Sequence, residues 1–324
     1  MSQTREERSL KDPLMNTSPD ETGFLETERY GLWRSEHPRV ALTIAGLDPS
    51  GGAGLIADLA TFDALGVYGM AVATTLTVQS TEGMSGRHDV SGGILGEQLG
   101  AVFTDRRPNA IKMGALGNRD IIVELEQFLR KEEYPGPLVI DPVIASGGGE
   151  PLLDDAGIGA LVDLLVPRAT ILTPNAEEVS RLCGFDVFEV KDLEAAALRL
   201  VSLGARAALV TGWKLVEGGR EYAADVLCEA HQIDVLKSPW IEGERVHGTG
   251  CVLSAAIAAM LARGKDLKSA VAEARRVVRA SMNDAVMPGQ GAAVANPFAT
   301  VRLRAFDRTK GGKHEDRLHK RHSR

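Results

Sequence analysis

The sequence predicts an α/β fold in which helices cover both faces of a central, mostly parallel sheet. Between residues 38 and 303, short strand-like apolar runs alternate with segments of helical spacing. A glycine-rich segment links the first strand-like run to the first helix. The chain has 324 residues, and its hydrophobic content of 44% is enough for a large core.

The first half of this folded region opens with a β-rich run at 40–45 and a helix at 55–65, whose apolar residues recur near helical spacing. After them we expect strands at 71–78, 110–113 and 138–140, and helices at 94–103 and 121–129. Because strands and helices follow one another in this order, parallel pairing is favoured.

The second half continues the alternation and adds one hairpin. Its apolar runs lie at 161–166, 170–172, 179–182, 207–210 and 252–261. Residues 223–228 and 232–236 are spaced as an antiparallel hairpin, which we expect near one edge of the sheet.

Two terminal segments differ in composition from the folded region. Residues 1–37 have no sustained apolar period and are predicted to be a flexible N-terminal extension. Residues 304–324 are rich in Lys, Arg and His and are predicted to be a basic, solvated C-terminal tail.

Charge, cysteine content and hydropathy narrow the function classes. The formal net charge of −7 argues against non-specific nucleic-acid binding, which needs clustered Lys and Arg. The three cysteines are widely spaced, so they offer neither a disulfide framework nor CxxC metal spacing, and we expect a cytoplasmic protein. No apolar run reaches the roughly 20 residues that a membrane helix requires, so no membrane partner is expected.

The segment from His247 to Cys251, His-Gly-Thr-Gly-Cys, is the most informative in the chain. Gly248 and Gly250 bracket Thr249 where a small-residue apolar helix begins. Successive backbone N–H groups and the positive end of the helix can hold an anion there. Because Cys251 lies in the first turn, its thiol is predicted to lose a proton readily. Together these features favour phosphoryl transfer.

A second glycine-rich loop, residues 45–54, fits neither of two common nucleotide motifs. Gly46 and Gly51 have the separation of a Walker A loop, but Gly52 and Ala53 replace its Lys and Ser/Thr. The spacing of the GxGxxG dinucleotide motif also fails. On spacing alone, a tight strand-to-helix turn and a ligand-binding loop remain equally good interpretations.

Together the two loops resemble those of the ribokinase-like small-molecule kinases, and most closely the hydroxymethylpyrimidine and phosphomethylpyrimidine kinases of thiamine biosynthesis. The resemblance covers about residues 39–296. Its most specific parts are Ala41–Gly46 with Asp48–Gly54, Ala57-Asp58-Leu59, and His247–Cys251. Cysteine at position 251 matters because many ribokinase-like sugar kinases carry aspartate there.

The resemblance implies a single α/β domain with a sheet of roughly eight or more strands, MgATP as phosphoryl donor, and a homodimer. It implies that the pyrimidine lies near Gly46, Asp58 and Gln79. It also implies that the ATP phosphates approach residues 248–251.

Several residues would hold the nucleotide and its metal under this resemblance. Asn175 and Glu178 match the family's NxxE element, which helps organise magnesium. Thr211 and Gly212 fall where the family has a Lys-Gly-Gly-His element beside the ATP phosphates. Asp141 ends a strand, and ligands gather at the carboxyl ends of strands in an open parallel sheet.

Each of these roles has a structural alternative. Asp58 could accept hydrogen bonds from the ring amine or be a solvated helix acid, and Gln79 could bind the ring or pair with backbone. Glu178 could bind Mg²⁺ or serve as a first-turn helix acid. Asp141 could take part in the magnesium and phosphate network or form a turn.

Cys251 carries the sharpest functional hypothesis. Its sulfur is predicted to take the proton from the substrate hydroxymethyl group during phosphoryl transfer. The alternative is that Cys251 is a small buried hydrophobe, as most free cysteines are.

The sequence departs from the family pattern at two lysines. Thr211-Gly212-Trp213-Lys214 replaces Lys-Gly-Gly-His, and Lys214 could reach the phosphates from a shifted origin. Gly147 stands where the family has a lysine, inside a segment, 146–149, that could close over the site. Both departures remove positive charge from the phosphate region.

Two other functions remain open. Pyridoxal kinase is the runner-up, because its substrate is also a hydroxymethyl heteroaromatic. A non-catalytic pyrimidine sensor on the same fold would explain the missing lysines, although the retained Gly-Thr-Gly-Cys loop argues against it.

Overall fold

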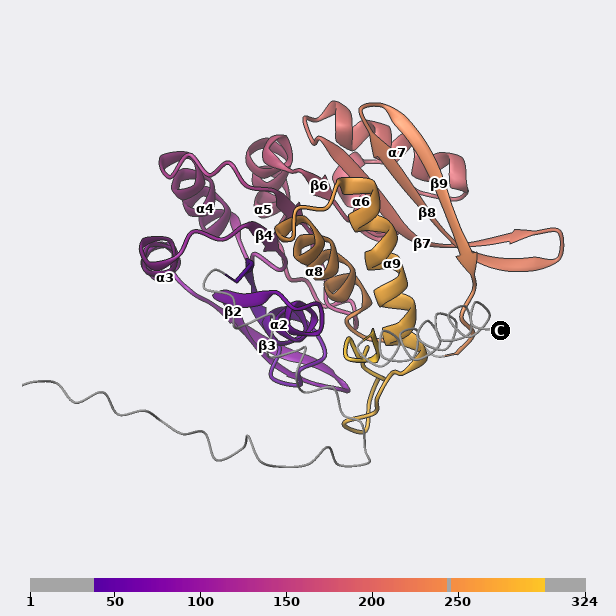
Figure 1. Cartoon of the computed structure of the whole chain (residues 1–324), viewed down its shortest axis with the longest axis horizontal. Coiled ribbons are helices and arrows are strands. Elements are labelled where there is room, and N and C mark those ends of the chain that lie inside the picture. Colours follow the sequence, from indigo (N-terminus) through magenta and orange to yellow (C-terminus); the bar gives the residue numbers. More distant parts are fainter. Residues whose placement is uncertain (1–37, 244–245, 301–324) are drawn as a thin grey trace, which may run out of the picture.

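A nine-stranded mixed sheet forms the centre of the protein (Figure 1). The computed structural model describes residues 38–243 and 246–300, so the predicted extension 1–37 and tail 304–324 lie outside the described residues. The strands are β1 (Val40–Leu47), β2 (Tyr68–Ser80), β3 (Gly83–Asp89), β4 (Ala110–Met113), β5 (Leu138–Ile140), β6 (Ile171–Leu172), β7 (Ala207–Glu217), β8 (Arg220–Glu229) and β9 (Gln232–Pro239). Their order across the sheet is β3-β2-β1-β4-β5-β6-β7-β8-β9.

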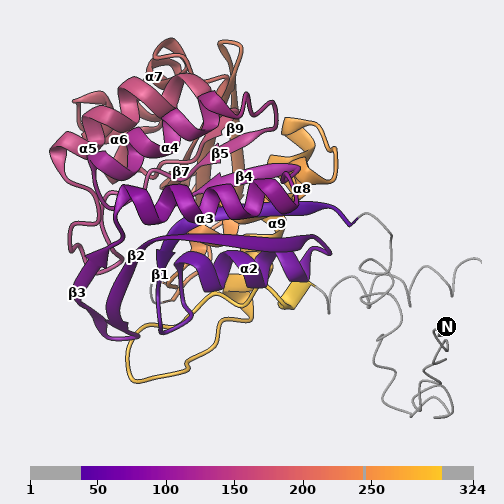
Figure 2. The ribbon, with the colours of Figure 1, turned by 90° about the vertical axis from the view of Figure 1, so that its left-hand side faces the viewer.

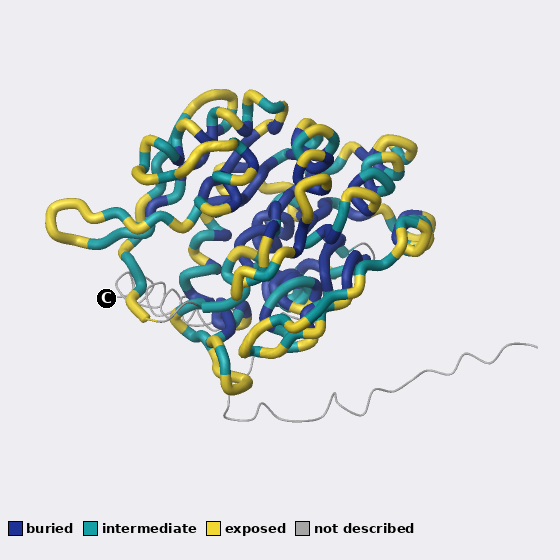
Figure 3. The backbone as a smooth tube through the Cα atoms, turned by 180° about the vertical axis from the view of Figure 1, so that it is seen from behind, coloured by how far each residue is buried: buried dark blue, intermediate teal, exposed yellow. Residues whose placement is uncertain are grey.

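The pairing is parallel from β2 to β7 and antiparallel at both edges. β1 pairs in parallel with β2 and β4, and the parallel series runs on through β5, β6 and β7. β3 is antiparallel to β2, while β7, β8 and β9 form an antiparallel meander. The predicted hairpin at one edge is therefore confirmed, and the outer end of the β7–β8 hairpin projects from the body as an exposed arm (Figure 3).

Helices cover both faces of the sheet, as the sequence predicts (Figure 2). The helices are α2 (Gly54–Ala64), α3 (Gly92–Asp105), α4 (Arg119–Lys131), α5 (Asp155–Ala160), α6 (Ala176–Cys183), α7 (Val190–Ser202), α8 (Thr249–Ala262) and α9 (Leu267–Asn283). One apolar core lies between the sheet and α3 to α7, and a second lies between the sheet and α2, α8 and α9. None of the described helices is long and apolar enough to cross a membrane.

The burial of α8 follows from its composition. It is apolar on nearly all sides, and most of its residues, Val252 to Met260 among them, are buried between the sheet and α9. A helix that is apolar all round is stable only in such a position. This packing fixes the first turn of α8 over the middle of the sheet.

The boundaries of most predicted elements agree with the structure, but some elements were missed. The predicted strands at 110–113 and 138–140 coincide with β4 and β5. The run 161–166 is neither strand nor α-helix, because Leu161–Leu165 forms a π-helical turn that leads into a 3-10 turn at Val166–Arg168. The prediction did not include β3, α5, α7 and α9. In α7 the buried Leu193, Ala196, Ala197 and Leu200 do follow helical spacing, so its signal was present.

Candidate active site

The two glycine-rich loops meet at the carboxyl edge of the central strands. Gly248 caps the start of α8 with φ of 84°, and a Cβ there would lie 1.9 Å from the carbonyl oxygen of Gly52. In the other loop, Gly54 has φ of 56°, and its Cβ would lie 2.1 Å from the carbonyl oxygen of Gly46. Glycine is required at positions 248 and 54 by both conformation and close approach. The loop 45–54 is therefore a tight strand-to-helix turn that also supports the start of α8.

Gly250, in contrast, faces open space. It is exposed, and the nearest atom to its ideal Cβ is Oδ2 of Asp141 at 3.9 Å, an ordinary contact distance. Its neighbour Thr249 begins the helix, so the N–H groups of the first turn have no partners within α8. No side chain caps this helix end. The first turn thus offers free backbone donors, as an anion-binding site needs.

Cys251 lies in this first turn but is not acidic in the free protein. Burial raises the pKa of its thiol to about 12, although the charge of Lys112 and a hydrogen bond from the backbone of Gly54 act in the opposite direction. The prediction that the helix start makes the thiol lose its proton readily is therefore wrong. The surroundings are not those of a simple buried hydrophobe either, because three charged groups lie near the sulfur.

Two of these charged groups form an ion pair inside the protein. Nζ of Lys112, on β4, lies 2.9 and 2.7 Å from the two carboxylate oxygens of Asp58, on α2. The hydroxyl of Thr43 donates to Asp58 Oδ2 at 2.6 Å. All three side chains have no exposed surface. Burial raises the pKa of Asp58, and the charge of Lys112 opposes this rise.

This arrangement corrects the role predicted for Asp58. The carboxylate was expected to accept hydrogen bonds from the substrate amine or to be solvated, yet it is fully buried and bonded to Lys112 and Thr43. It therefore lies beneath the site without facing a ligand. The sequence does not predict the pairing of Lys112 with Asp58, because the two residues are brought together only by the tertiary structure.

Asp141 is the third charged group near Cys251. It follows β5, is 4% exposed, and its Oδ2 accepts a 2.9 Å hydrogen bond from Ser254 of α8. The Ser254 hydroxyl oxygen also lies 2.9 Å from the carbonyl oxygen of Gly250, so its single proton is shared between the two acceptors. Burial raises the pKa of Asp141, while Lys112 and Ser254 oppose the rise. Asp141 thus connects the end of the central sheet to the first turn of α8.

Glu178 is a first-turn acid of α6, as the structural alternative predicts, and its carboxyl group is affected by the negative charge of Asp141. Asn175 and Glu178 form a capping box at the start of α6, in which the Asn175 N–H donates to Glu178 Oε2 and the Glu178 N–H donates to Asn175 Oδ1, each at 2.9 Å. Burial, and then the negative charge of Asp141, raise the pKa of Glu178 to about 8. A cation between these two carboxylates would relieve that repulsion.

The carboxylates of Asp141 and Glu178 suit Mg²⁺ better than a metal ion that takes all of its ligands from the protein. In the described ranges no three His, Cys, Asp or Glu side chains are grouped as a metal site. Mg²⁺ commonly takes one or two carboxylates and completes its shell with water and phosphate oxygens. The buried, mutually repelling oxygens of Asp141 and Glu178 fit that pattern.

Gln79 lies on the other side of the site, beside His247. Nε2 of Gln79 is 3.3 Å from Nε2 of His247, which in turn is 3.4 Å from Oδ2 of Asp48. Hydrogen bonds from His247 and others outweigh burial and lower the pKa of Asp48. An ideal Cβ at Gly147 would lie 3.1 Å from Nδ1 of His247. His247, for which sequence reasoning offered no role, therefore joins β2, the first glycine loop and the 146–149 segment.

The predicted nucleotide residues lie on β7 and beside the start of α6. Thr211 pairs with the chain at Pro174 and Asn175, and the N–H of Gly212 donates to Asp225 at 2.9 Å. The side chain of Lys214 is engaged elsewhere, because its Nζ lies 2.8 Å from Glu221 and 5.2 Å from the ring centre of Trp240. The geometry therefore offers no support for a shifted phosphate-binding lysine.

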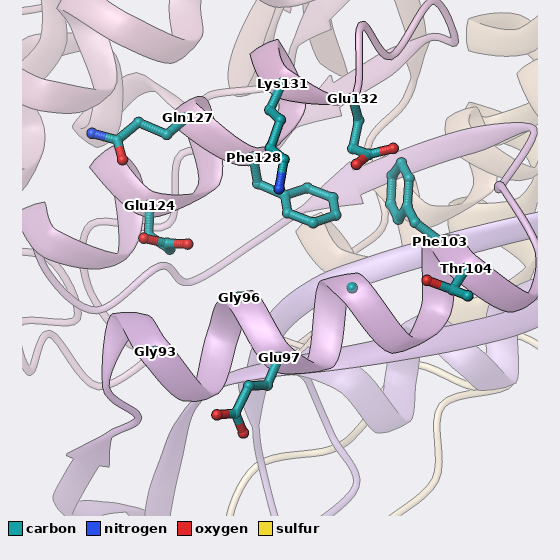
Figure 4. A pocket seen from close by; sticks show the side chains of 11 residues that line it. Gly93, Gly96, Glu97, Phe103, Thr104, Glu124, Gln127, Phe128, Lys131 and Glu132 are labelled. Carbon is teal, nitrogen blue, oxygen red and sulfur yellow. The ribbon is translucent and has the colours of Figure 1, made fainter.

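Two cavities lie outside the cluster around Cys251. One, of about 670 Å³, lies between α3 and α4, where Phe103 and Phe128 line it among charged residues (Figure 4). None of its lining residues is a predicted site residue. The other, of about 560 Å³, is lined by residues of α6, the segment after it, and Gly212 to Lys214 of β7.

The chain is similar in sequence and in fold to known proteins. The family model for phosphomethylpyrimidine kinase matches residues 48–296. The hydroxymethylpyrimidine/phosphomethylpyrimidine kinase of Bacillus subtilis is 36% identical over 263 residues, which are 81% of this chain and 96% of that relative.

Two solved structures have similar folds. A Bacillus subtilis pyridoxal kinase in complex with ADP has a TM-score of 0.73 and 32% identity, covering 82% of this chain and 99% of that one. A phosphomethylpyrimidine kinase from Clostridium difficile has a TM-score of 0.66 and 36% identity, covering 75% of this chain and 99% of that one.

Proposed function

The chain belongs to the phosphomethylpyrimidine kinase family, and on that premise we propose that it phosphorylates hydroxymethylpyrimidine, its monophosphate, or both, in thiamine biosynthesis. The phosphoryl donor is ATP. The observation that carries this proposal is the open first turn of α8, which presents free backbone donors and the sulfur of Cys251 on the same side of the sheet as Asp141.

The reaction would run as a single in-line transfer. The acceptor oxygen forms a bond to the γ-phosphorus as the bond from that phosphorus to the leaving ATP oxygen breaks. The backbone N–H groups of Thr249, Gly250 and Cys251 would stabilise the negative charge on the transferred group. When the acceptor is the hydroxymethyl group, its hydroxyl loses a proton, and the thiolate of Cys251 would accept that proton.

The high pKa of Cys251 has a direct consequence for this step. At neutral pH the free protein holds the thiol in its protonated form, so the thiolate is a minor species but a strong base. The charged groups around the sulfur therefore affect how much thiolate is available.

Asp141 and Glu178 would hold magnesium, with water in the remaining positions. When bound, this ion would neutralise the charge of the ATP phosphates. Asn175 orients Glu178 through the capping box, and Thr211 and Gly212 would border the nucleotide. On the acceptor side, Gly46, Gln79 and His247 would surround the pyrimidine ring, which has both donors and acceptors.

We propose that the enzyme is cytoplasmic, because its three widely spaced cysteines offer no disulfide framework, and that it is a homodimer, as the family resemblance implies. Sedimentation equilibrium of the full chain measures the second property directly, and a monomer at micromolar concentration would contradict it.

Pyridoxal kinase remains the second candidate because a pyridoxal kinase has a very similar fold. A panel of hydroxymethylpyrimidine, its monophosphate and pyridoxal, each assayed with MgATP for ADP release, separates the two activities. The proposal expects the highest kcat/KM with one of the pyrimidines. Preference for pyridoxal would replace it with the second candidate, and tight pyrimidine binding without ADP release would indicate a sensor.

A further inference from the structure

A buried cation lies beneath the first turn of α8. Lys112 is on the central strand β4 and has no exposed surface, and its ammonium contacts both oxygens of Asp58. The chain leaves room for this charge, because a Cβ at Gly114 would come within 2.8 Å of Nζ. Burying a lysine is costly, and an ion pair offsets that cost only in part. A purely structural position would be filled more easily by an apolar residue.

Cys251 lies on the same side of α2 as this ion pair. The backbone of Gly54, the first residue of α2, forms a hydrogen bond with the sulfur. Asp58 is four residues further along, so it lies one turn below Gly54 on the same helix face. Helix α8 packs directly on β4, which carries Lys112. The sulfur, the carboxylate and the ammonium are therefore neighbours from three separate elements.

The charges around the sulfur have opposite effects. Lys112 stabilises the thiolate, whereas Asp58 on α2 and Asp141 after β5 destabilise it. Among the charged groups that act on this sulfur in the described part of the chain, Lys112 is the positive one. Reciprocally, although burial lowers the pKa of Lys112, the charge of Asp58, and then those of Cys251 and Asp141, raise it above its usual range, so the amine remains charged.

We propose that Lys112 is a positioning residue whose ammonium stabilises the thiolate of Cys251, and that Asp58 orients this ammonium while limiting its effect. The role in turnover rests on the proposed function, since the thiolate is the proposed proton acceptor. The electrostatic part does not depend on catalysis, because it concerns only the thiol of the free protein.

The reactivity of Cys251 toward iodoacetamide tests the proposal without substrate. Alkylation consumes the thiolate, and the rate at fixed pH changes about threefold for each pH unit by which the thiol pKa moves, after allowing for the change in nucleophilicity. The rate would be measured by mass spectrometry of the peptide containing Cys251. Cys228 is fully buried, so its alkylation reports unfolding in the same sample.

Two neutralising variants are expected to act in opposite directions. Lys112→Met removes the positive charge and should slow alkylation of Cys251 by threefold or more, and Lys112→Arg should restore most of the rate. Asp58→Asn removes the negative charge and should accelerate alkylation by a similar factor. A general loosening of the fold would instead accelerate alkylation of Cys251 in both variants and would also expose Cys228 to alkylation.

The Asp58→Asn variant keeps the proposal testable if Lys112→Met does not fold. With Cys228 still protected, an unchanged or slower rate in Asp58→Asn would overturn the proposal, as would equal rates in wild type and a folded Lys112→Met. The proposed function fails separately: full turnover by a Cys251→Ala variant would remove the proton acceptor while leaving the alkylation result intact.

Discussion

Glu178 offers the sharpest prediction about stability, because its carboxyl group is buried beside Asp141. Its folded-state pKa of about 8 lies well above the ordinary value of 4.5. The folded protein therefore keeps this proton in a pH range where the unfolded chain has lost it. Stability from this group is fully present below about pH 4.5 and is lost as the pH rises through about 8.

The size of the effect follows from the same two values. The interval between 4.5 and about 8 corresponds to about 5 kcal/mol at most, at about 1.4 kcal/mol for each pH unit. Replacing Glu178 with Gln removes this penalty. It also weakens the contacts with the backbone of Asn175 and Ile144, at a cost of about 1 kcal/mol. We expect the stability curves of wild type and Glu178→Gln to cross near pH 5, where the wild-type penalty is about 1 kcal/mol, and the variant to be more stable by about 2–4 kcal/mol above about pH 8.

Urea unfolding in EDTA, repeated between about pH 5 and pH 9, measures this crossing. Glu177→Gln is the matched control, since Glu177 is the exposed neighbour on the same helical turn. Its curve should stay within about 0.5 kcal/mol of wild type. Parallel stability curves for wild type and Glu178→Gln across the whole range would refute the reasoning, because the carboxyl would then titrate normally.

Three further changes test the site itself. Gly250→Ala should leave the melting temperature nearly unchanged, since its Cβ would meet only Asp141 Oδ2 at 3.9 Å, but should lower kcat by about tenfold or more because that Cβ would enter the proposed phosphate site. Gly248→Ala should instead destabilise the fold, because its Cβ would meet the backbone of Gly52. Similar losses of stability in the two variants, read by calorimetry, would contradict this contrast. The rate of phosphoryl transfer in single turnovers should rise with pH between about 7 and 10, because the pKa of Cys251 is about 12. The Cys251→Ala variant should lose this pH dependence and most of its activity. A wild-type rate that does not change with pH would argue against a thiolate as proton acceptor. His247→Ala should raise KM for the pyrimidine more than KM for ATP, because the His247 ring contacts Gln79 and Asp48. Equal increases in both constants would exclude a role of His247 confined to binding the pyrimidine.

The sequence alone determined the fold class and the position of the glycine-rich turn at the start of α8. Alternating apolar runs predict the parallel sheet because a strand and a helix each bury one face, and that local pattern is written in consecutive residues. The glycines and Cys251 could be recognised for the same reason, since a turn and the helix that follows it are contiguous. By contrast, β3 (Gly83–Asp89) has no alternating apolar pattern and is set by its pairing with β2.

Only the tertiary structure decided the electrostatic state of the site. Lys112 and Asp58 are 54 positions apart in the chain, and nothing in either local segment predicts that they form an ion pair from which solvent is excluded. Their burial turned the expected substrate ligand into part of an internal ion pair and made Cys251 a weak acid where its position at a helix start predicted a stronger one. A pKa depends on the water removed and on charges brought near by distant segments, and both are properties of the packed molecule.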